Sequence, residues 1–567
     1  MPSAEPGTPL WRHVAAVLAG AGCHLVTGVP SDEPALLDAA LTVPGLKGVP
    51  VRDQRAGACL AAGHALVSGS PAVLATNSGP SLPNAMAGLL EAASLHAPVV
   101  VVTTRIPRSG LGRGGFQQVD QRALCAAVAK WHVLAEQVDQ LDWALRQAVH
   151  RAVNGAPGVV VVEIAEEVLQ GEPPPETAPL AETAAQGPVR RLRSAPAADD
   201  LGRAAEVMAE ATAPVIIAGG GAKASGAGAP LRALAETWGA AVFATAAGRA
   251  VLDEDHPRYC GLAGLYAGAP AAALLDDADV ILALGTRLEE TVRTGWTLSR
   301  QRLIHVDIDP DAFGLAVRPE IALAGDAALT ARLLAAALRP NPSPAWSERI
   351  AAVRAQPVPE GSLAASTLRA VAARFGRDLV LVQENGLHDM WSYHFPLLSL
   401  SERAKVVAPG EQTMMGFGVA ASLGAALAQP SLPTVVICGD GAMTMSMNAL
   451  PVATELGRGI VFVVFDNGGF GWPRHVRALA GSDTRLTRFP GGEPPYEAVV
   501  RALGGWTARC HTAGDLGPAL EEAAKHAANG TLALVAVPVS DTDIPPGVLR
   551  VYGGAPEPHD KADDHDT

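Results

Sequence analysis

The sequence has few features that cross-link a protein or attach it to a membrane. Its 567 residues include six cysteines, and no two of them form a C-x-x-C pair of the kind that binds metal or cycles through a disulfide. They are therefore predicted to be small buried residues in a reducing compartment. No uninterrupted apolar run reaches the roughly 18 residues of a membrane span. Lys and Arg form no polybasic cluster that would hold the chain to anionic lipid. The cysteines are Cys23, Cys59, Cys125, Cys260, Cys438 and Cys510.

Positive charge is scarce as well. Lys and Arg number 43 against 57 Asp and Glu, which gives a net charge of −14 and an isoelectric point near 5.5. An acidic surface repels phosphate backbones, so nucleic acid is not an expected partner. Hydrophobic residues make up 49% and charged residues 18% of the chain, which excludes a disordered protein. The length predicts about three to four domains.

The N-terminal segment has two interpretations. Arg12 and His13, followed by the Ala-rich stretch 14–23, resemble a short signal or lipoprotein sequence. However, the apolar residues of 11–18 fit one face of a helix, and residues 24–30 then have the pattern of a buried strand. We therefore expect a soluble, cytoplasmic protein that begins with a helix.

Short apolar runs alternate with longer helical patterns through most of the chain. This rhythm predicts parallel sheets with helices on both faces. The expected fold class is therefore α/β, with three doubly wound parallel-sheet domains at residues 1–185, 195–340 and 355–550. A helix is expected at residues 82–96, and strands at 72–76, 98–104, 214–218, 240–245, 280–285, 303–307, 379–383, 434–439, 460–465 and 531–539.

Two stretches interrupt the rhythm. Residues 172–196 are rich in Pro, Ala, Thr and Glu, and residues 338–346 contain Arg-Pro-Asn-Pro-Ser-Pro. Both compositions are typical of linkers. Residues 553–567 are polar and acidic and are predicted to form a loose tail.

The third domain carries the pattern with the clearest chemical meaning. The predicted strand at 434–438 ends in Gly439-Asp440-Gly441, and the strand at 460–465 ends in a turn that contains Asn467. Both polar side chains then lie at the sheet edge where α/β proteins bind ligands. Their oxygens suit a hard divalent cation, and neighbouring amides with Mg²⁺ suit a diphosphate. Alone, Gly-Asp-Gly is better explained as a turn, but the two strand ends together favour a cofactor site.

These motifs resemble those of the thiamine diphosphate-dependent enzyme superfamily of acetolactate synthase/pyruvate decarboxylase type, over nearly the whole chain. Gly-Asp-Gly followed one strand later by Asn is similar to its diphosphate motif. Residues 413–428 resemble the segment beneath the thiazolium ring. Residues 77–84 resemble the G-P-G-x-x-N turn, with Ser81 replacing the second Gly, and 116–118 resemble the F-Q-E of acetolactate synthases.

The resemblance implies a role for each matched residue. Asp440, Asn467 and the Gly469 carbonyl would bind Mg²⁺, and the three domains would be pyrimidine-binding, central Rossmann-like and diphosphate-binding. Met415 would hold the cofactor bent; from the residue alone a core methionine is the better explanation, and only its place in the motif reverses this. The expected cofactor-binding residues are Pro30, Gln54, Gly79, Asn84, Thr413, Met415, Gly439, Asp440, Gly441, Ala442, Met443, Asn467, Gly469 and Phe470. The expected catalytic residues are Gln54, Gln117, His388, Met415 and His475. In this family the site forms between two chains, so a homodimer or homotetramer is expected.

One family position differs. Relatives carry a glutamate in a segment like residues 52–65, where it shares a proton with the pyrimidine and helps to generate the C2 carbanion. The matching residue here is Gln54, whose amide can hydrogen-bond the ring nitrogen but cannot exchange a proton with it. The chain is therefore either an unusual active enzyme, as in glyoxylate carboligase-like relatives, or a homologue that binds cofactor without turnover. The intact Mg²⁺ ligands favour an active enzyme.

The central domain contains a strand that leads into Gly219-Gly220-Gly221. This turn suggests a nicotinamide site, but Ala224 stands where a third Gly would be and the next strand ends in Thr245 rather than an acid. A structural domain is the preferred interpretation. Some relatives bind FAD or ADP here, and FAD is not predicted.

Substrate signals are fewer. Residues 27–31, Thr-Gly-Val-Pro-Ser, are similar to a loop of sulfopyruvate and phosphonopyruvate decarboxylases. Trp472, Arg474 and His475 follow the turn that contains Asn467. Arg474 is a candidate for bidentate carboxylate binding. His388 is a candidate for proton transfer. A structurally bonded residue explains each of them equally well.

The sequence predicts a thiamine diphosphate- and Mg²⁺-dependent enzyme that decarboxylates a 2-oxo acid and joins the remainder to an acceptor carbonyl. Its partners would be these small molecules and further copies of the chain, without nucleic acid or membrane. One alternative is a simple decarboxylase of a substituted pyruvate. The others are a non-catalytic cofactor-binding homologue and, remotely, a nicotinamide dehydrogenase.

Overall fold

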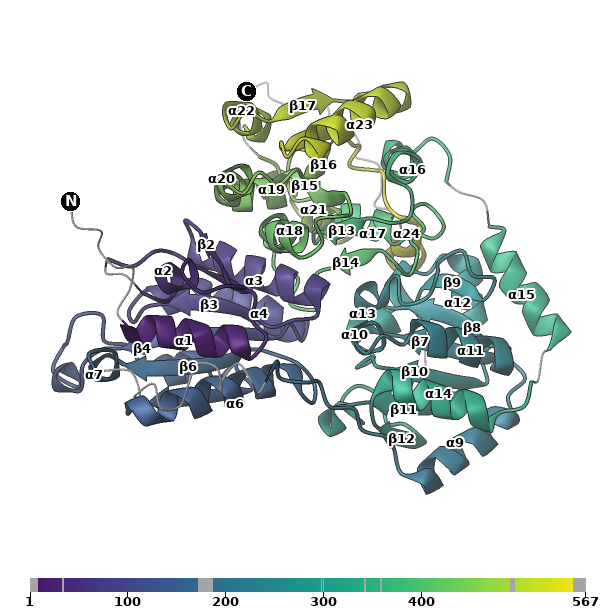
Figure 1. The fold of residues 1–567 in the computed structure, drawn as a ribbon. Coiled ribbons are helices and arrows are strands. Elements are labelled where there is room, and N and C mark those ends of the chain that lie inside the picture. The colour runs from purple at the N-terminus through teal and green to yellow at the C-terminus, as the bar shows by residue number, and fades with distance from the viewer. Residues whose placement is uncertain are drawn as a thin grey trace.

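Three parallel sheets of six strands each form the three lobes of the chain (Figure 1). The computed structural model describes residues 9–32, 35–171, 187–296, 298, 300–340, 343–356, 359–489 and 495–553. The sheets span residues 25–165, 214–324 and 380–538, each inside one predicted domain. The predicted α/β class is confirmed. In the part of the chain that the structure describes, no helix is both long and apolar enough to cross a membrane.

The first domain has strand order β2-β1-β3-β4-β6-β5. Its strands are β1 (Leu25–Gly28), β2 (Lys47–Pro50), β3 (Ala72–Thr76), β4 (Val99–Arg105), β5 (Trp131–Ala135) and β6 (Val160–Ala165). Its helices are α1 (Pro9–Gly20), α2 (Leu36–Ala40), α3 (Gln54–Ser68), α4 (Ser81–Ser94), α5 (Gln121–Cys125), α6 (Leu141–Val153) and α7 (Glu166–Leu169). Strands such as β4 are buried over most of their length because helices cover both faces of the sheet.

The central domain has the order β12-β11-β10-β7-β8-β9. Its strands are β7 (Pro214–Ala218), β8 (Ala241–Ala244), β9 (Tyr259–Leu262), β10 (Val280–Leu284), β11 (Arg302–Asp307) and β12 (Ile321–Ala324). Its helices are α9 (Ala198–Ala209), α10 (Gly220–Ala224), α11 (Gly228–Trp238), α12 (Ala269–Asp276), α13 (Glu290–Arg293), α14 (Ala327–Ala337) and α15 (Pro344–Arg354). Counted along the chain, this is the order of a dinucleotide-binding sheet.

The third domain has the order β14-β13-β15-β16-β18-β17. Its strands are β13 (Val380–Gln383), β14 (Lys405–Val407), β15 (Thr434–Gly439), β16 (Val461–Asp466), β17 (Trp506–Arg509) and β18 (Ala533–Pro538). Its helices are α16 (Leu363–Phe375), α17 (Leu387–Ser392), α18 (Phe417–Ala428), α19 (Asp440–Ser446), α20 (Leu450–Glu455), α21 (Gly471–Leu479), α22 (Tyr496–Ala502), α23 (Ala513–Ala528) and α24 (Pro546–Tyr552). Counted along the chain, the first and third sheets have the same strand order, so α3 and α18 occupy equivalent places.

The equivalent helices α3 and α18 pack directly against each other and join the first domain to the third (Figure 1). Glycines make the close approach possible. A Cβ at Gly424 would lie 1.9 Å from the Leu60 carbonyl oxygen, and one at Gly63 would lie 2.1 Å from the Ala421 carbonyl oxygen. The two backbones therefore touch where side chains would hold them apart.

A buried ion pair joins the central domain to the third. The Arg249 guanidinium donates to both Glu254 carboxylate oxygens, at 3.1 and 2.9 Å, and to the main-chain oxygens of Ser392 and Leu398. Glu254 also accepts from the Leu400 amide. Both side chains are 2% exposed. Their mutual attraction and their hydrogen bonds to main-chain groups offset the cost of removing two charges from water.

The predicted linkers are only partly described. Residues 172–186 of the first lie outside the described residues, as do 341–342 of the second and 554–567 of the predicted tail. The second linker was predicted too long, because α15 begins at Pro344. Ser343 accepts a hydrogen bond from the Trp346 amide, and Pro344 takes the first helical position, a combination that starts helices. The six cysteines are all buried and unpaired, as predicted.

Candidate functional site

A cavity of about 110 Å³ opens at the carboxyl edge of the third sheet. It brings together Asp440 and Asn467 with Met415 and His388, which come from the ends of β15 and β16 and from the segments before α18 and within α17. The other predicted residues in its lining are Gly439, Gly441, Ala442, Gly469 and Phe470. Met443 is fully buried in the core and does not line the cavity. Every lining residue belongs to the third domain.

Asp440 is a buried carboxylate held by two main-chain amides. It accepts from Gly441 and from Gly469, both at 2.9 Å. Burial raises the pKa of Asp440 well above the ordinary aspartate value, and the nearby Asp466 carboxylate adds to the shift. Asp466 itself is held by the Tyr496 hydroxyl at 2.9 Å and by the Arg509 guanidinium at 2.8 Å. Asp466 already has a cationic partner, whereas Asp440 has none among the described residues. A bound metal cation would offset the cost of burying the Asp440 charge, so Asp440 is the better candidate for a metal ligand.

Two polar atoms at the cavity, Asn467 Oδ1 and His388 Nε2, are buried and have no hydrogen-bond partner among the described residues. Burial lowers the pKa of His388 to about 3, so its ring is neutral. The ring fits because neighbouring residues lack a side chain. A Cβ at Gly439 would lie 2.9 Å from its Cε1, and one at Gly386 would lie 2.5 Å from it. Buried polar atoms are normally hydrogen-bonded, so these two unpaired atoms indicate a place where a ligand binds.

These residues fit the group that the motif implies. Asp440 and the free Asn467 oxygen offer the hard ligands that Mg²⁺ takes, and main-chain oxygens and waters complete such sites. The described residues contain no cluster of three or more His, Cys, Asp or Glu side chains that could hold a metal. The candidate metal site therefore depends on an amide and a main-chain oxygen beside one carboxylate.

The segment before α18 is shaped by two buried glutamates that sequence analysis missed. Glu91 of α4 accepts from the main-chain amides of Gly410 and Met414. Between them, Thr413 has φ +48°, an unusual backbone for a β-branched residue. Thr413 lines a second, larger cavity instead of the small one. An acid inside the apolar stretch of α4 was the available signal.

The second missed residue is Glu384, which follows β13 at the same sheet edge. Its carboxylate accepts from the amides of Gly416 and Val419, at 3.1 and 2.8 Å, and so fixes the start of α18 beside Met415. Burial raises its pKa to about 7, against the opposing effect of the amide donors. Its position directly after a buried strand is the same signal that identified Asp440.

The predicted first-domain residues gather at a different edge. Gln117, in a left-handed conformation at φ 59°, lies against Gly79, where a Cβ would be 2.6 Å from the Gln117 Cβ. Pro30 and Asn84 are exposed. Gln54 is 3% exposed and turns inward, where its amide nitrogen donates to Ser81 Oγ. None of these residues lines the small cavity.

Arg474 and His475, which follow the turn with Asn467, do not line the small cavity, contrary to the prediction from the sequence. The Arg474 guanidinium is bound by Asp541 and by the main-chain oxygens of Asn467 and Thr487, so it is not free to receive a substrate carboxylate. His475 is buried behind Trp472, with ring centroids 6.2 Å apart, and does not line the cavity. Trp472 does line it. The helical period of α21 explains the difference, because successive residues point to different sides.

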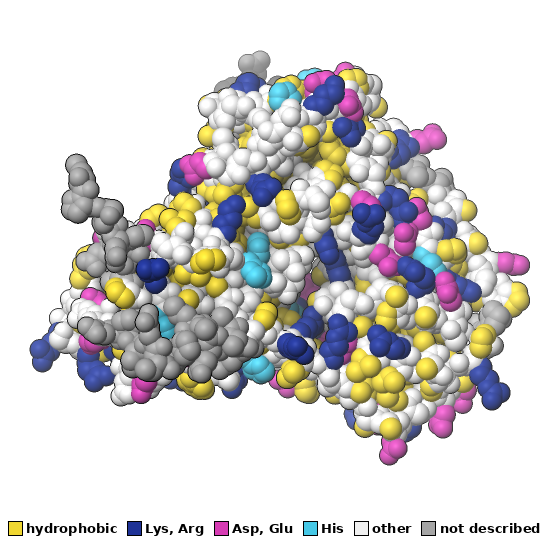
Figure 2. All heavy atoms as spheres, in the orientation of Figure 1, with side chains coloured by type: hydrophobic (Ala, Val, Ile, Leu, Met, Phe, Trp, Pro, Cys, Tyr) yellow, Lys and Arg dark blue, Asp and Glu magenta, His cyan; other side chains and the backbone are white. Residues whose placement is uncertain are grey.

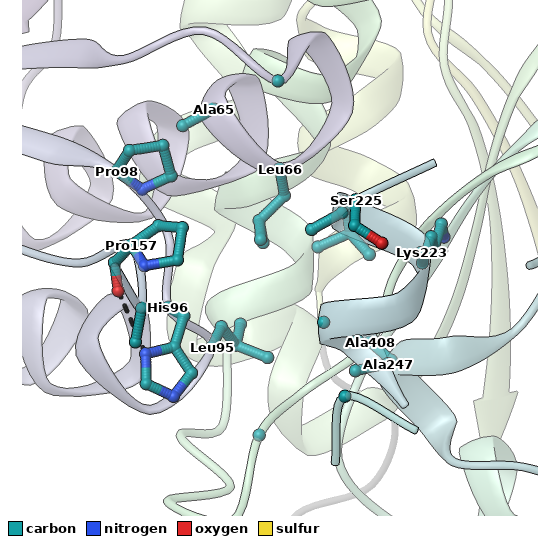
Figure 3. Close-up of a pocket in the computed structure, with 18 of the residues that line it drawn as sticks. Ala65, Leu66, Leu95, His96, Pro98, Pro157, Lys223, Ser225, Ala247 and Ala408 are labelled. Carbon is teal, nitrogen blue, oxygen red and sulfur yellow. Dashed lines mark hydrogen bonds between the residues drawn. The ribbon is translucent and has the colours of Figure 1, made fainter. Parts of the chain in front are cut away.

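A larger cavity of about 780 Å³ lies where the three domains meet. Leu66, Leu95 and His96 of the first domain face Lys223 and Ser225 of the central domain across it (Figure 3). Lys, Arg and His side chains surround the hollow between the lobes (Figure 2). The cavity lies over the loops that follow β7, β10 and β11, at the carboxyl edge of the central sheet, which is where such sheets hold nucleotides.

Lys223 and Arg191 are cations of this cavity that have no carboxylate within ion-pair distance among the described residues. Lys223 Nζ donates to the Val406 carbonyl oxygen at 3.3 Å, and Arg191 donates to the Ala224 carbonyl oxygen at 2.6 Å. Burial lowers the pKa of Lys223 to about 7, assisted by Lys405, and also lowers the pKa of Arg191. Unpaired cations beside a roomy cavity are typical of a site for an anionic ligand.

Fold and cavity together define the class: a three-domain α/β protein with a candidate metal and phosphate site at the strand ends of its third sheet. Three family descriptions match successive parts of the chain. "Thiamine pyrophosphate enzyme, N-terminal TPP binding domain" matches residues 10–124, the central domain of the same family matches 201–334, and its C-terminal TPP binding domain matches 384–537. The chain belongs to the thiamine diphosphate-dependent enzyme superfamily, of acetolactate synthase/pyruvate decarboxylase type, and is a thiamine diphosphate-dependent enzyme.

Individual relatives agree with this membership. The chain is 28% identical to a probable acetolactate synthase large subunit of Methanocaldococcus jannaschii, over 85% of this chain and 84% of that one. It is also 28% identical to an acetolactate synthase of Mycobacterium leprae, over 88% and 82%. The thiamine diphosphate-dependent 4-hydroxybenzoylformate decarboxylase of Rhodococcus jostii RHA1 has the same fold, with a TM-score of 0.79, 23% identity, and coverage of 94% and 99%.

Proposed function

We propose that the protein is a thiamine diphosphate- and Mg²⁺-dependent 2-oxo acid decarboxylase that passes the decarboxylated fragment to an acceptor carbonyl. The observation that carries this proposal is the small cavity, where Asp440 and the unpaired Asn467 oxygen lie beside Met415. When bound, thiamine diphosphate supplies a thiazolium carbon that adds to a 2-oxo acid and accepts the electrons released with CO₂.

The residues of the chain would bind and orient this cofactor. Asp440, Asn467 and the Gly469 carbonyl would hold Mg²⁺ against the diphosphate, and Met415 would support the bent cofactor from below. The neutral His388 can donate or accept a hydrogen bond at the diphosphate end without adding charge. The apolar Phe470 and Trp472 would keep water from the reacting carbon.

The cavity supports assembly from two chains. All its lining residues come from the third domain, whereas Gly79, Gln117 and Ser81 form a separate edge of the first domain. We therefore infer that a second copy of the chain places its first domain over the cofactor. Light scattering on purified protein should give at least a dimer, and a cofactor-loaded monomer would contradict the inference.

Product analysis tests the reaction. The holoenzyme is incubated with pyruvate, glyoxylate and substituted pyruvates, and products are identified by NMR. A ligated product is expected. A free aldehyde from a sulfonated or phosphonated pyruvate would instead show a simple decarboxylase. Tight cofactor binding without CO₂ release from any acid would show a non-catalytic homologue.

The large cavity favours a second ligand, and we infer that it binds an adenine nucleotide such as ADP or the ADP part of FAD. Its size, its position over the central sheet and the unpaired Arg191 and Lys223 support this inference. Calorimetry with ADP and a visible spectrum of the purified protein test it. Lys223→Met should weaken ADP binding, and no binding of either ligand would refute the inference.

A further inference from the structure

Two of the positions at which the chain departs from its family motifs, Gln54 and Ser81, contact each other. Gln54 begins α3 and Ser81 begins α4, and Gln54 Nε2 donates to Ser81 Oγ at 2.8 Å. Both helices start at the carboxyl edge of the first sheet, where such sheets bind ligands. Gln54 is 3% exposed, whereas Ser81 is only partly buried. Ser81 is therefore the outer member of the pair.

Hydrogen bonds fix the direction of the Gln54 amide. Nε2 also lies 3.4 Å from the Ala75 carbonyl oxygen, which only accepts, so the amide nitrogen must face it. Gln54 Oε1 is then turned into the interior, 3.7 Å from the place of a Cβ at Gly57, and it is buried with no hydrogen-bond partner in the described part of the chain. The side chain of Gln54 consequently presents no group outward.

The Ser81 oxygen receives a second hydrogen bond, from the Asn77 main-chain amide at 3.2 Å. A serine hydroxyl has two lone pairs and one proton. With both lone pairs occupied by Gln54 and Asn77, the hydroxyl can only donate. Among the described residues it has no acceptor, so at this partly exposed sheet edge its proton is available to solvent or to a bound ligand.

We propose that Ser81, and not Gln54, is the hydrogen-bond donor that the first domain presents to the aminopyrimidine ring nitrogen of thiamine diphosphate. Gln54 is the positioning residue behind it. The hydroxyl keeps its proton, so it polarises the ring without the proton exchange that a glutamate performs. This assignment rests on the proposed function, with the cofactor held by the third domain of a second copy.

The experiment compares thiamine diphosphate with an analogue in which this ring nitrogen is replaced by CH. Affinity of the Mg²⁺-loaded, full-length protein for both is measured by calorimetry. The wild type should prefer the natural cofactor. Ser81→Ala should weaken natural cofactor binding about three- to tenfold, the size of one hydrogen bond, and leave analogue binding nearly unchanged. Gln54→Leu should reduce the preference in the same direction, because it frees the hydroxyl to rotate.

Ser366→Ala in α16 is the matched control, since among the described residues its hydroxyl bonds only to the Ser362 carbonyl oxygen at the helix start and to Arg369 of the same helix. It should preserve the preference. Ser81→Ala weakening both ligands equally would show a merely structural role and overturn the proposal. A wild type that binds neither ligand would refute the proposed function itself, so the two failures are distinguishable. Thermal unfolding of each variant confirms that it is folded.

Discussion

At the scale of single residues, the candidate metal site depends on Asp440. Asp440→Ala should abolish retention of thiamine diphosphate with Mg²⁺, because the diphosphate charge loses its cation. Asn467→Ala should act in the same direction but more weakly, since the lost ligand is neutral. Calorimetry measures both. Asp483→Ala, a change to an exposed aspartate paired with Arg485, serves as the control. Unchanged affinity in Asp440→Ala would show that the cofactor binds elsewhere.

Glu384 should make stability depend on pH. Its folded pKa of about 7 lies above the ordinary glutamate value of 4.5. Between these values the folded protein binds more protons than the unfolded chain, so this residue lowers stability as pH rises. Glu384→Gln cannot titrate.

The unfolding temperature of Glu384→Gln minus that of the wild type should therefore rise as the pH is raised from about 5 to about 8. The amide nitrogen loses one main-chain hydrogen bond at every pH, so the variant can be less stable throughout without affecting this trend. Parallel curves for the two proteins would contradict the prediction.

Some site residues were predictable from sequence and others were not. Asp440 and Asn467 could be found because each follows an apolar strand, and position in a parallel sheet brings them together. For Glu91 the sequence shows only an acid within an apolar helix, and its role could not be predicted because it depends on α4 packing against a loop more than 300 residues later. The Gln54–Ser81 contact could not be predicted either, because it depends on how the starts of α3 and α4 lie beside each other in the folded domain. Which way Arg474 points depends on Asp541, a partner that no local pattern identifies.

At the scale of elements, the contact of α3 with α18 limits what Gly424 can become. A Gly→Ala change inside a helix ordinarily stabilises it by up to ~1 kcal/mol. Gly424→Ala should instead destabilise the protein by about 1–3 kcal/mol, because the new Cβ overlaps the Leu60 carbonyl oxygen. Gly202→Ala in α9, where a Cβ meets nothing within 4 Å, is the control and should be neutral or stabilising. Urea unfolding midpoints measure both, and equal shifts would contradict the packing argument.

Strand positions were also mostly predictable, since buried parallel strands are continuous apolar runs. The prediction for β7 matches its observed bounds, and that for β15 does so as well. Sequence analysis missed the six edge strands β2, β5, β9, β12, β14 and β17 and also the inner strand β6. Two of the edge strands, β2 (Lys47–Pro50) and β14 (Lys405–Val407), are short and begin with a lysine. Their identity depends on pairing with β1 and β13 rather than on composition.

At the scale of the whole molecule, Arg249 and Glu254 hold the central and third domains together. Arg249→Met should cost roughly 3–5 kcal/mol, because it leaves the Glu254 carboxylate buried without its counter-charge. Replacing both residues, in Arg249→Met/Glu254→Leu, should restore part of this loss. Differential scanning calorimetry measures the stability of each variant. A double variant less stable than Arg249→Met would contradict the argument.

The separation of the small cavity from the Ser81 edge has a genetic consequence. If each active site takes its metal cavity from one chain and its Ser81 edge from another, a defect in one domain does not stay within its own chain. A dimer of one Asp440→Ala chain and one wild-type chain should bind one cofactor, at the wild-type cavity covered by the variant's intact first domain. Two different lesions, one in each of these domains, should therefore complement each other when the genes are expressed together.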